Sequence, residues 1–238
     1  MNAAVGRYAA VIGLGSMGMG IARALRRGGF DVVGCDANPA TVEHFVREGG
    51  RGAPDPASAA ANVDIVICVV VNAAQTEAVL FGENGVASSM PEGAVFISSA
   101  TMDPAACRRL AARLESAGRL YLDAPISGGA ARAADGTLTV LASGPRAAFA
   151  KARLVLDAMA AKVHDLGAEV GLGSAFKMIN QLLAGVHIAA AGEAIAFAAK
   201  QGLDQRKVYE VITGSAGNSW MFIGRARHAL ADWDLRLF

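Results

Sequence analysis

The sequence predicts an α/β domain with a mainly parallel sheet, followed by a long helix and an all-helical second domain. Short β-branched runs alternate with helix-like segments over the first two thirds of the 238 residues, which is typical of βαβ units. After Gly167 the strand signals stop, and residues 171–202 read as one helix of about 45 Å at 1.5 Å per residue. We therefore expect domains at residues 1–168 and 169–238.

The elements follow one another regularly along the chain. The predicted strands are residues 8–13, 31–36, 64–71, 94–99, 120–125, 137–143 and 162–167. The run IVICVVV is apolar without alternation, as expected for a central strand that is covered on both faces. The predicted helices between strands are residues 16–28, 39–48, 73–80, 103–117 and 146–160, and Pro39 and Pro104 suit first turns. The segment DQRKVYEVITGS predicts a last helix, with Asp204 near its start.

The composition excludes several classes of protein. The formal net charge is +1 and the 22 basic residues are scattered, so we expect no nucleic acid and no membrane as partner. Cys35, Cys68 and Cys107 lie in or beside apolar runs without a CxxC pair, which favours core thiols in a reducing compartment. We find no targeting segment and no metal-ligand spacing. The expected location is the cytoplasm.

A glycine-rich loop follows the first predicted strand. The segment VIGLGSMGMG contains G-x-G-x-x-G at Gly13, Gly15 and Gly18 and opens a predicted helix. Asp36 ends the next strand, 18 residues after Gly18. Such glycines permit a tight turn, the approach of a pyrophosphate and close helix–strand packing, while the acid binds ribose hydroxyls. This register favours a dinucleotide over a ligand-free turn, and the lack of an arginine directly after Asp36 favours NAD over NADP. The expected NAD-binding residues here are Gly13, Leu14, Gly15, Ser16, Met17, Gly18 and Asp36.

Two later segments carry candidate substrate-binding groups. Ser127, Gly128 and Gly129 come at the end of a predicted strand and at an apparent helix start. Their N–H groups and the hydroxyl suit a carboxylate, although a plain glycine-rich turn is the alternative. In AFKMINQLLAG, Lys177, Asn180 and Gln181 have i, i+3 and i+4 spacing and share one helical face. The alternative for Lys177 is a side chain that extends its amine to solvent.

Three motifs in the same order resemble the β-hydroxyacid dehydrogenase family. They are GLGSMGMGIA, PISGGAARAADGTL and AFKMINQLL, and the resemblance runs from about residue 7 to about residue 224. It implies a Rossmann domain joined by a long helix to a helical domain, with the substrate in the cleft between them. It also implies that Ser127, Gly128 and Gly129 hold the substrate carboxylate, that Lys177 is catalytic and that Asn180 positions the substrate. Thr101 matches a threonine near the nicotinamide ribose, and Val70 and Val71 match the loop after the family's fourth strand.

The implied activity is NAD-dependent oxidation of a small hydroxy acid, with Lys177 taking the hydroxyl proton as general base. Gln181 replaces a common asparagine, and the segment GNSWMF resembles the L-threonate dehydrogenase branch, which oxidises four-carbon sugar acids. A 3-hydroxyisobutyrate dehydrogenase and a tartronate semialdehyde reductase are the alternatives. The family's helical domain normally continues beyond the length of this chain, so we expect its C-terminal part to be missing. Either a homo-oligomer formed through the helical domain covers the apolar faces, or the chain is a catalytically impaired NAD-binding protein.

Overall fold

The computed structural model describes residues 7–224. The chain divides into two compact units, of which the first ends at Met178 and the second begins at Ile179. The boundary falls within the long helix α8 (Leu172–Lys200). Each unit contains buried clusters of apolar side chains of its own.

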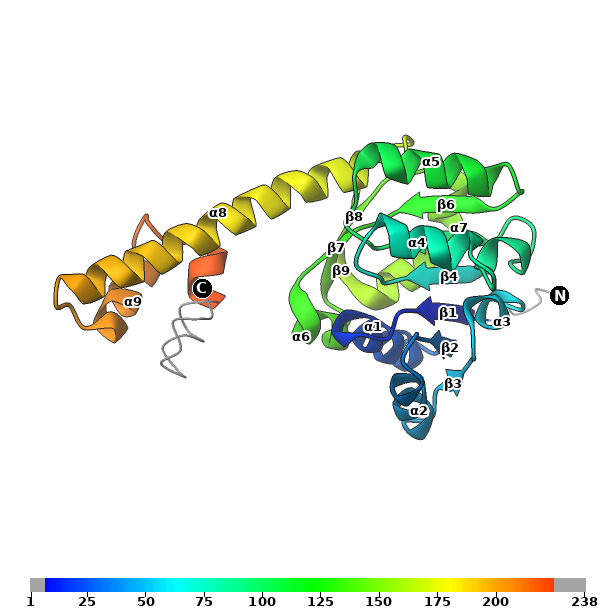
Figure 1. Cartoon of the computed structure of the whole chain (residues 1–238), viewed down its shortest axis with the longest axis horizontal. Helices are drawn as coiled ribbons and strands as arrows, with labels where there is room; N and C mark the ends of the chain where they lie inside the picture. Colours follow the sequence, from blue (N-terminus) through cyan, green and yellow to red (C-terminus); the bar gives the residue numbers. More distant parts are fainter. Residues whose placement is uncertain (1–6, 225–238) are drawn as a thin grey trace. The chain divides into compact units, whose positions relative to one another are not determined.

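The first unit is built on a six-stranded parallel sheet with the strand order β3-β2-β1-β4-β5-β6 (Figure 1). The strands are β1 (Tyr8–Ile12), β2 (Asp31–Cys35), β3 (Arg51–Gly52), β4 (Ile65–Cys68), β5 (Val95–Ser98) and β6 (Leu120–Asp123). The strand that contains IVIC is buried at every position, as its unbroken apolar run predicts. The predicted mainly parallel α/β fold is confirmed.

Helices cover both faces of this sheet. In β1, Ala9 and Val11 face one core cluster while Ala10 and Ile12 face the other, because successive side chains of a strand point to opposite faces. The first cluster includes side chains of α1 (Ser16–Arg27), α2 (Pro39–Arg47) and α7 (Arg146–Met159). The second includes side chains of α3 (Pro56–Ala60), α4 (Ala73–Phe81), η1 (Val86–Ser88) and α5 (Pro104–Glu115).

After β6, the chain forms a second sheet of three strands. It consists of β7 (Ile126–Ser127), β8 (Leu138–Ala142) and β9 (Ala160–Asp165), with β7 antiparallel and β9 parallel to β8. The last two predicted strands therefore belong to this second sheet. Sequence patterns did not predict β3, α3, η1 or β7, and of the seven-residue helix α6 (Gly129–Asp135) they indicated only the start, because elements this short carry too little periodicity to be recognised.

The predicted core thiols are confirmed as buried. Cys35, Cys68 and Cys107 are all free and buried. Burial raises the pKa of Cys35 to about 11 and that of Cys68 and Cys107 to about 12. These thiols are therefore protonated at neutral pH and act as small apolar side chains.

The second unit consists of the later turns of α8, the helix α9 (Gln205–Thr213) and the segment that follows it. Asp204 caps α9 by accepting a hydrogen bond from the Lys207 N–H at 2.9 Å, as its position before the helix predicts. A small core forms around Ala191, Ile195 and Phe222. Within residues 7–224, α8 alone is long and apolar enough to cross a bilayer, but buried core helices of other proteins meet the same criterion.

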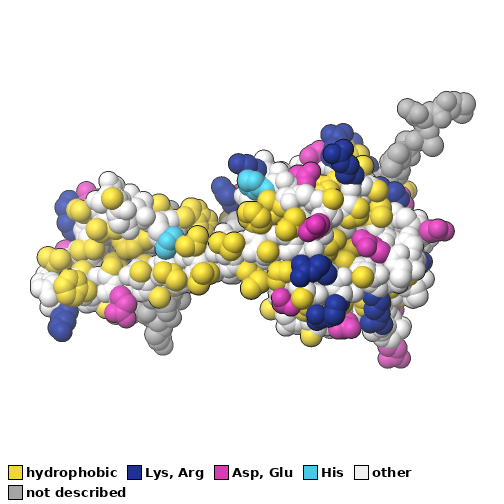
Figure 2. Space-filling model, turned by 90° about the horizontal axis from the view of Figure 1, so that it is seen from above, with side chains coloured by type: hydrophobic (Ala, Val, Ile, Leu, Met, Phe, Trp, Pro, Cys, Tyr) yellow, Lys and Arg dark blue, Asp and Glu magenta, His cyan; other side chains and the backbone are white. Residues whose placement is uncertain are grey.

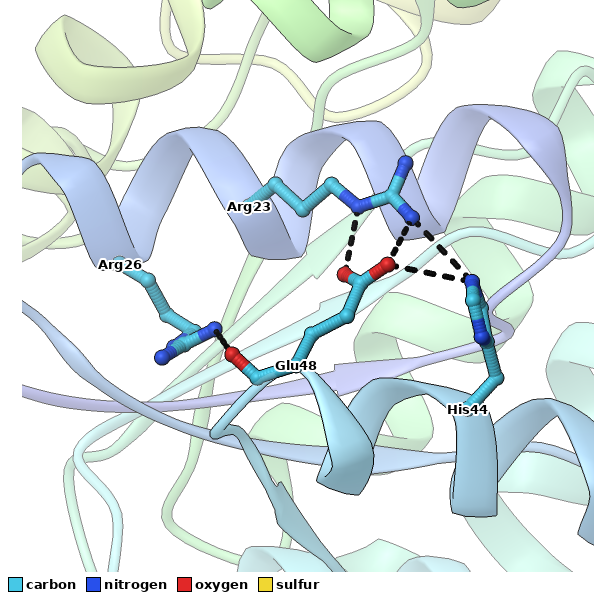
Figure 3. A network of polar contacts seen from close by, with 4 residues as sticks. All are labelled: Arg23, Arg26, His44 and Glu48. Atoms are coloured by element: carbon cyan, nitrogen blue, oxygen red, sulfur yellow. Dashed lines mark hydrogen bonds and ion pairs between the residues drawn. The ribbon is translucent and has the colours of Figure 1, made fainter.

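An ion-pair network joins α1 to the end of α2 (Figure 3). The Arg23 guanidinium donates to both carboxylate oxygens of Glu48, with an Nε–Oε2 distance of 2.7 Å. The Nε2 of His44 lies 3.1 Å from Oε1 of Glu48, and Arg26 donates to the Glu48 carbonyl at 2.7 Å. The hydrogen bond from Arg23 lowers the pKa of the Glu48 carboxyl.

This network predicts a pH-dependent contribution to stability. A carboxyl pKa that is lower in the fold than in the unfolded chain stabilises the protein above the unfolded value of about 4.3. That stabilisation is lost as the pH falls through the folded value. We expect Glu48→Gln to lower the free energy of unfolding by under about 1 kcal/mol at pH 7, because the pair is partly solvent-exposed.

Urea denaturation at pH 7 and again near pH 3 measures this difference, which should be smaller at the lower pH. Glu43→Gln is the matched control, because Glu43 and its partner Arg47 are largely exposed and 3.9 Å apart. An equal loss of stability at both pH values would show that the carboxylate charge of Glu48 makes no such contribution.

Candidate active site

The glycine loop lies where β1 meets α1. Gly13 has a φ of +92° and donates its N–H to the Cys35 carbonyl at 2.8 Å. A Cβ at Gly13 would lie 2.4 Å from the Val69 carbonyl oxygen, and one at Gly18 would lie 1.7 Å from that of Gly13. Both positions therefore require glycine, one for the turn and the other for helix–strand contact.

The open side of the same loop suits an anion. Gly15 precedes the first residue of α1, with a φ of −60° and no side-chain cap. A Cβ there would meet nothing within 4 Å, and both Gly15 and Ser16 are exposed. The free N–H groups and positive dipole end of a twelve-residue helix thus face open space. This arrangement fits the pyrophosphate of a dinucleotide.

Asp36 is held at the end of β2 beside this loop. Its Oδ2 accepts a hydrogen bond from the Leu14 N–H at 2.6 Å, and its Oδ1 accepts one from the Asn38 N–H at 2.8 Å. Each carboxylate oxygen keeps further acceptor capacity for a ribose hydroxyl. Leu14 itself is 2% exposed, so its side chain belongs to the core and it faces the loop through its backbone.

The remaining predicted cofactor residues lie at the same edge of the sheet. Val70 and Val71 follow β4, and Thr101 follows β5. The strand order places β1 between β2 and β4, so the order in which successive strands are added reverses beside β1, which is where parallel α/β sheets bind their ligands. The Val71 N–H donates to Oε1 of Gln75 at 2.8 Å, and Thr101 is half-buried.

The second glycine turn lies between β7 and α6. Gly128 and Gly129 have φ values of +140° and +78°, and a Cβ at Gly129 would meet nothing within 4 Å. The helix that follows packs closely on α1, since a Cβ at Gly20 would lie 2.7 Å from the backbone nitrogen of Ala134. The turn and the cofactor loop therefore precede two helices that contact each other.

Lys177 is brought to this second turn. Its side chain is 7% exposed, and its Nζ donates to the Ile126 carbonyl at 2.8 Å. Ile126 directly precedes Ser127. Burial lowers the pKa of the Lys177 amine below its ordinary value. The amine therefore does not extend to solvent, and it loses its proton at a lower pH than an ordinary lysine does.

Asn180 and Gln181 lie beyond the end of the first unit and belong to the second. The Asn180 amide donates to Oε1 of Gln181 at 3.1 Å, and the Gln181 side chain is exposed. Their roles at the substrate remain predictions.

Sequence reasoning missed three buried polar residues at the start of α8, the helix that carries Lys177. Asp123, Ser143 and Ser174 are all 0% exposed and are linked by hydrogen bonds. A charged residue at the end of the apolar strand LYLD was the available signal, because such a residue is rarely buried without partners. Within residues 7–224 no group of three or more His, Cys, Asp and Glu side chains could hold a metal ion.

Two family models cover most of the chain. Residues 8–167 match the NAD binding domain of 6-phosphogluconate dehydrogenase, and residues 171–235 match the NAD-binding domain of NADP-dependent 3-hydroxyisobutyrate dehydrogenase. An L-threonate dehydrogenase from Cupriavidus necator is 52% identical over 224 residues, which are 94% of this chain and 75% of that protein. One from Escherichia coli K12 is 46% identical, over 94% of this chain and 74% of its own.

The fold of solved relatives agrees with these matches. A crystal structure of 3-hydroxyisobutyrate dehydrogenase from Salmonella typhimurium is 45% identical with a TM-score of 0.90, covering 94% of this chain and 79% of its own. The enzyme from Mycobacterium tuberculosis is 32% identical with a TM-score of 0.81, covering 92% and 74%. Together with the dinucleotide loop at the sheet edge, these matches show that the chain belongs to the NAD-dependent β-hydroxyacid dehydrogenase family.

Proposed function

We propose that the protein oxidises L-threonate, or a similar four-carbon sugar acid, with NAD and uses Lys177 as general acid/base. The observation that carries the proposal is the buried Lys177 amine, which lies 2.8 Å from the Ile126 carbonyl. Ile126 directly precedes the Ser127–Gly129 turn. The choice of substrate is supported by relatives named L-threonate dehydrogenase that are 45–52% identical.

The lysine performs the proton transfer. Its neutral amine accepts the proton of the substrate hydroxyl during oxidation, and its ammonium returns a proton during reduction. The hydrogen bond to Ile126 persists in both protonation states, because the amine and the ammonium both carry N–H donors. The Gly13–Gly18 loop and Asp36 would hold NAD, which would supply the acceptor for the hydride that leaves the carbinol carbon.

The other site residues would bind and orient the acid. The N–H groups and hydroxyl of the Ser127–Gly129 turn suit the substrate carboxylate. Asn180 and Gln181 are proposed to bind substrate hydroxyl groups, the longer glutamine reaching a hydroxyl that a methyl-bearing acid lacks.

The decisive experiment is a substrate panel measured by the absorbance of the reduced cofactor. It compares the oxidation of L-threonate and 3-hydroxyisobutyrate with NAD and with NADP, and the reduction of tartronate semialdehyde with NADH and with NADPH. We expect the highest kcat/KM for L-threonate with NAD. The second candidate, 3-hydroxyisobutyrate, is favoured by the 45% identical crystal structure that bears that enzyme's name. Binding of NAD without turnover of any acid would instead support a catalytically impaired NAD-binding protein.

Asp36 gives a prediction about cofactor choice. Its carboxylate, fixed by Leu14 and Asn38, would repel the 2′-phosphate of NADP. We expect Asp36→Asn to raise the ratio of kcat/KM with NADP to that with NAD by about tenfold, which corresponds to about 1.4 kcal/mol. Asp31→Asn is the control, because Asp31 lies at the opposite end of β2 and pairs with Arg51 at 3.0 Å. An unchanged ratio in Asp36→Asn would remove this residue from cofactor selection.

We also propose a cytoplasmic homo-oligomer. The second unit exposes large apolar side chains, including Leu182, Phe197 and Trp220, and apolar atoms are visible along its surface in Figure 2. Exposed apolar area of this kind supports association with a second copy. Light scattering after size-exclusion chromatography would measure the mass, and a monomer at micromolar concentration would contradict the proposal.

The proposed cytoplasmic location is supported by the three buried free thiols, which suit a reducing compartment.

A further inference from the structure

The helix that carries Lys177 begins in a buried position. Its first turn is held by side chains of the two sheets. Oδ2 of Asp123 accepts hydrogen bonds from the N–H groups of Gly171 at 3.1 Å and Ser174 at 2.8 Å. Oδ1 accepts from the Ser174 hydroxyl at 2.8 Å. The Gly173 N–H donates to the Ser143 hydroxyl at 3.0 Å. These bonds satisfy N–H groups that a helix start leaves free.

The carboxylate suits this position electrostatically as well. A negative charge at a helix N-terminus is stabilised by the helix dipole. Burial raises the pKa of the Asp123 carboxyl, and the hydrogen bonds from Ser174 oppose that rise. The other ionisable side chains facing Asp123 are Cys107 and Tyr121, whose pKa values are both raised by burial. Both stay protonated at neutral pH, and the hydrogen bonds to the Asp123 oxygens are donated by the start of α8.

The segment that holds the helix start also holds the lysine. Asp123 ends β6, and the chain reaches Ile126 three residues later and the Ser127–Gly129 turn directly after it. Ile126 accepts the hydrogen bond from Lys177. Ser174 precedes Lys177 by three residues, about 4.5 Å along the helix axis. One short segment therefore contacts α8 at its first turn and again one turn later.

The helix start has no room to shift toward the sheets. A Cβ at Gly173 would lie 2.4 Å from the carbonyl oxygen of Leu141 and 2.9 Å from that of Asp123. The backbone of α8 thus rests directly on β8 and β6 at this point. The position of its first turn is fixed by direct contact with both strands as well as by the hydrogen bonds.

We propose that Asp123 is a positioning residue for the reaction, which through Ser174 and the first turn of α8 fixes the Lys177 amine beside the Ser127–Gly129 turn. The inference rests on the proposed catalytic role of Lys177. An aspartate is required because both of its oxygens accept hydrogen bonds. An asparagine has one acceptor oxygen, and its NH₂ group would face a donor.

Asp123→Asn and Ser174→Ala test the proposal. We expect kcat/KM to fall by about 10- to 100-fold, because small displacements of a reacting group have effects of this size. The pH profile of kcat/KM should also shift to higher pH, since water reaches the amine when the helix start loosens. The dissociation constant of NAD should stay within about twofold of the wild-type value. Asp165→Asn is the control, because Asp165 ends β9, is exposed and accepts only a local bond from the Gly167 N–H.

NMR titration of selectively labelled lysine provides a readout that does not depend on turnover. The Lys177 signal is assigned by its loss in Lys177→Ala, and its pKa should be higher in Ser174→Ala than in the wild type. If Asp123→Asn does not fold, the milder Ser174→Ala decides the question. Wild-type kcat/KM, pH profile and Lys177 pKa in that variant would overturn the positioning role. Undiminished turnover in Lys177→Ala would instead overturn the proposed function itself.

Discussion

Replacing Lys177 by alanine is expected to reduce turnover of the hydroxy acid by about 10²- to 10⁴-fold, the usual contribution of a general acid/base. The affinity for NAD should be nearly unchanged. The Lys177 amine contacts the Ile126 carbonyl, whereas the proposed pyrophosphate site is the glycine loop after β1. Initial rates from the absorbance of NADH, together with a dissociation constant for NAD from calorimetry, measure the two quantities separately.

Lys177→Arg separates proton transfer from simple charge. A guanidinium keeps the positive charge but is not deprotonated in proteins, so this variant should be as slow in oxidation as Lys177→Ala. In the wild type, kcat/KM for oxidation should rise with pH as the amine loses its proton. The midpoint of this rise should lie below the ordinary pKa of a lysine, because burial lowers the pKa of Lys177.

Lys200→Ala is the matched control for both variants. Lys200 lies in the last turn of the same helix and is exposed, so its removal should leave kcat/KM unchanged. Wild-type rates in Lys177→Ala would show that another group transfers the proton.

Gly15→Ala is expected to weaken NAD binding by about 10- to 100-fold without changing the stability of the protein. The backbone at Gly15 has a φ of −60°, and a methyl group there would meet no atom within 4 Å. The free protein should therefore tolerate alanine within about 0.5 kcal/mol. A pyrophosphate lying against this backbone would meet the added methyl group.

Gly18→Ala serves as the comparison, because this substitution is expected to lower the stability of the free protein. Its Cβ would lie 1.7 Å from the Gly13 carbonyl oxygen, so the helix must move and the free energy of unfolding should fall by about 1–3 kcal/mol or more. Urea denaturation and NAD titration of both variants measure these effects. Wild-type NAD affinity in Gly15→Ala would place the pyrophosphate elsewhere.

The local patterns predicted much of the fold. The predicted helix at residues 171–202 is observed as Leu172–Lys200, and the strand–glycine–helix register places Gly13–Gly18 and Asp36 at one sheet edge as expected. The short strand β7 was missed and only the start of α6 was indicated, although these two elements carry the Ser127–Gly129 turn. With two and seven residues, β7 and α6 are too short to show a periodicity of their own. Pairing with β8 and packing on α1 fix them instead.

The sequence by itself determined the alternating strands and helices, the dinucleotide loop and the presence of a lysine in an apolar helix. These follow from backbone propensities and hydrophobic periodicity, which act over a few residues. Only the tertiary structure decided that the Lys177 amine is buried against Ile126 and that Asp123 holds the start of its helix. Each of these contacts joins residues that are 48 or 51 positions apart in the sequence. Desolvation and hydrogen bonding depend on which distant segments meet, and local sequence does not specify that meeting.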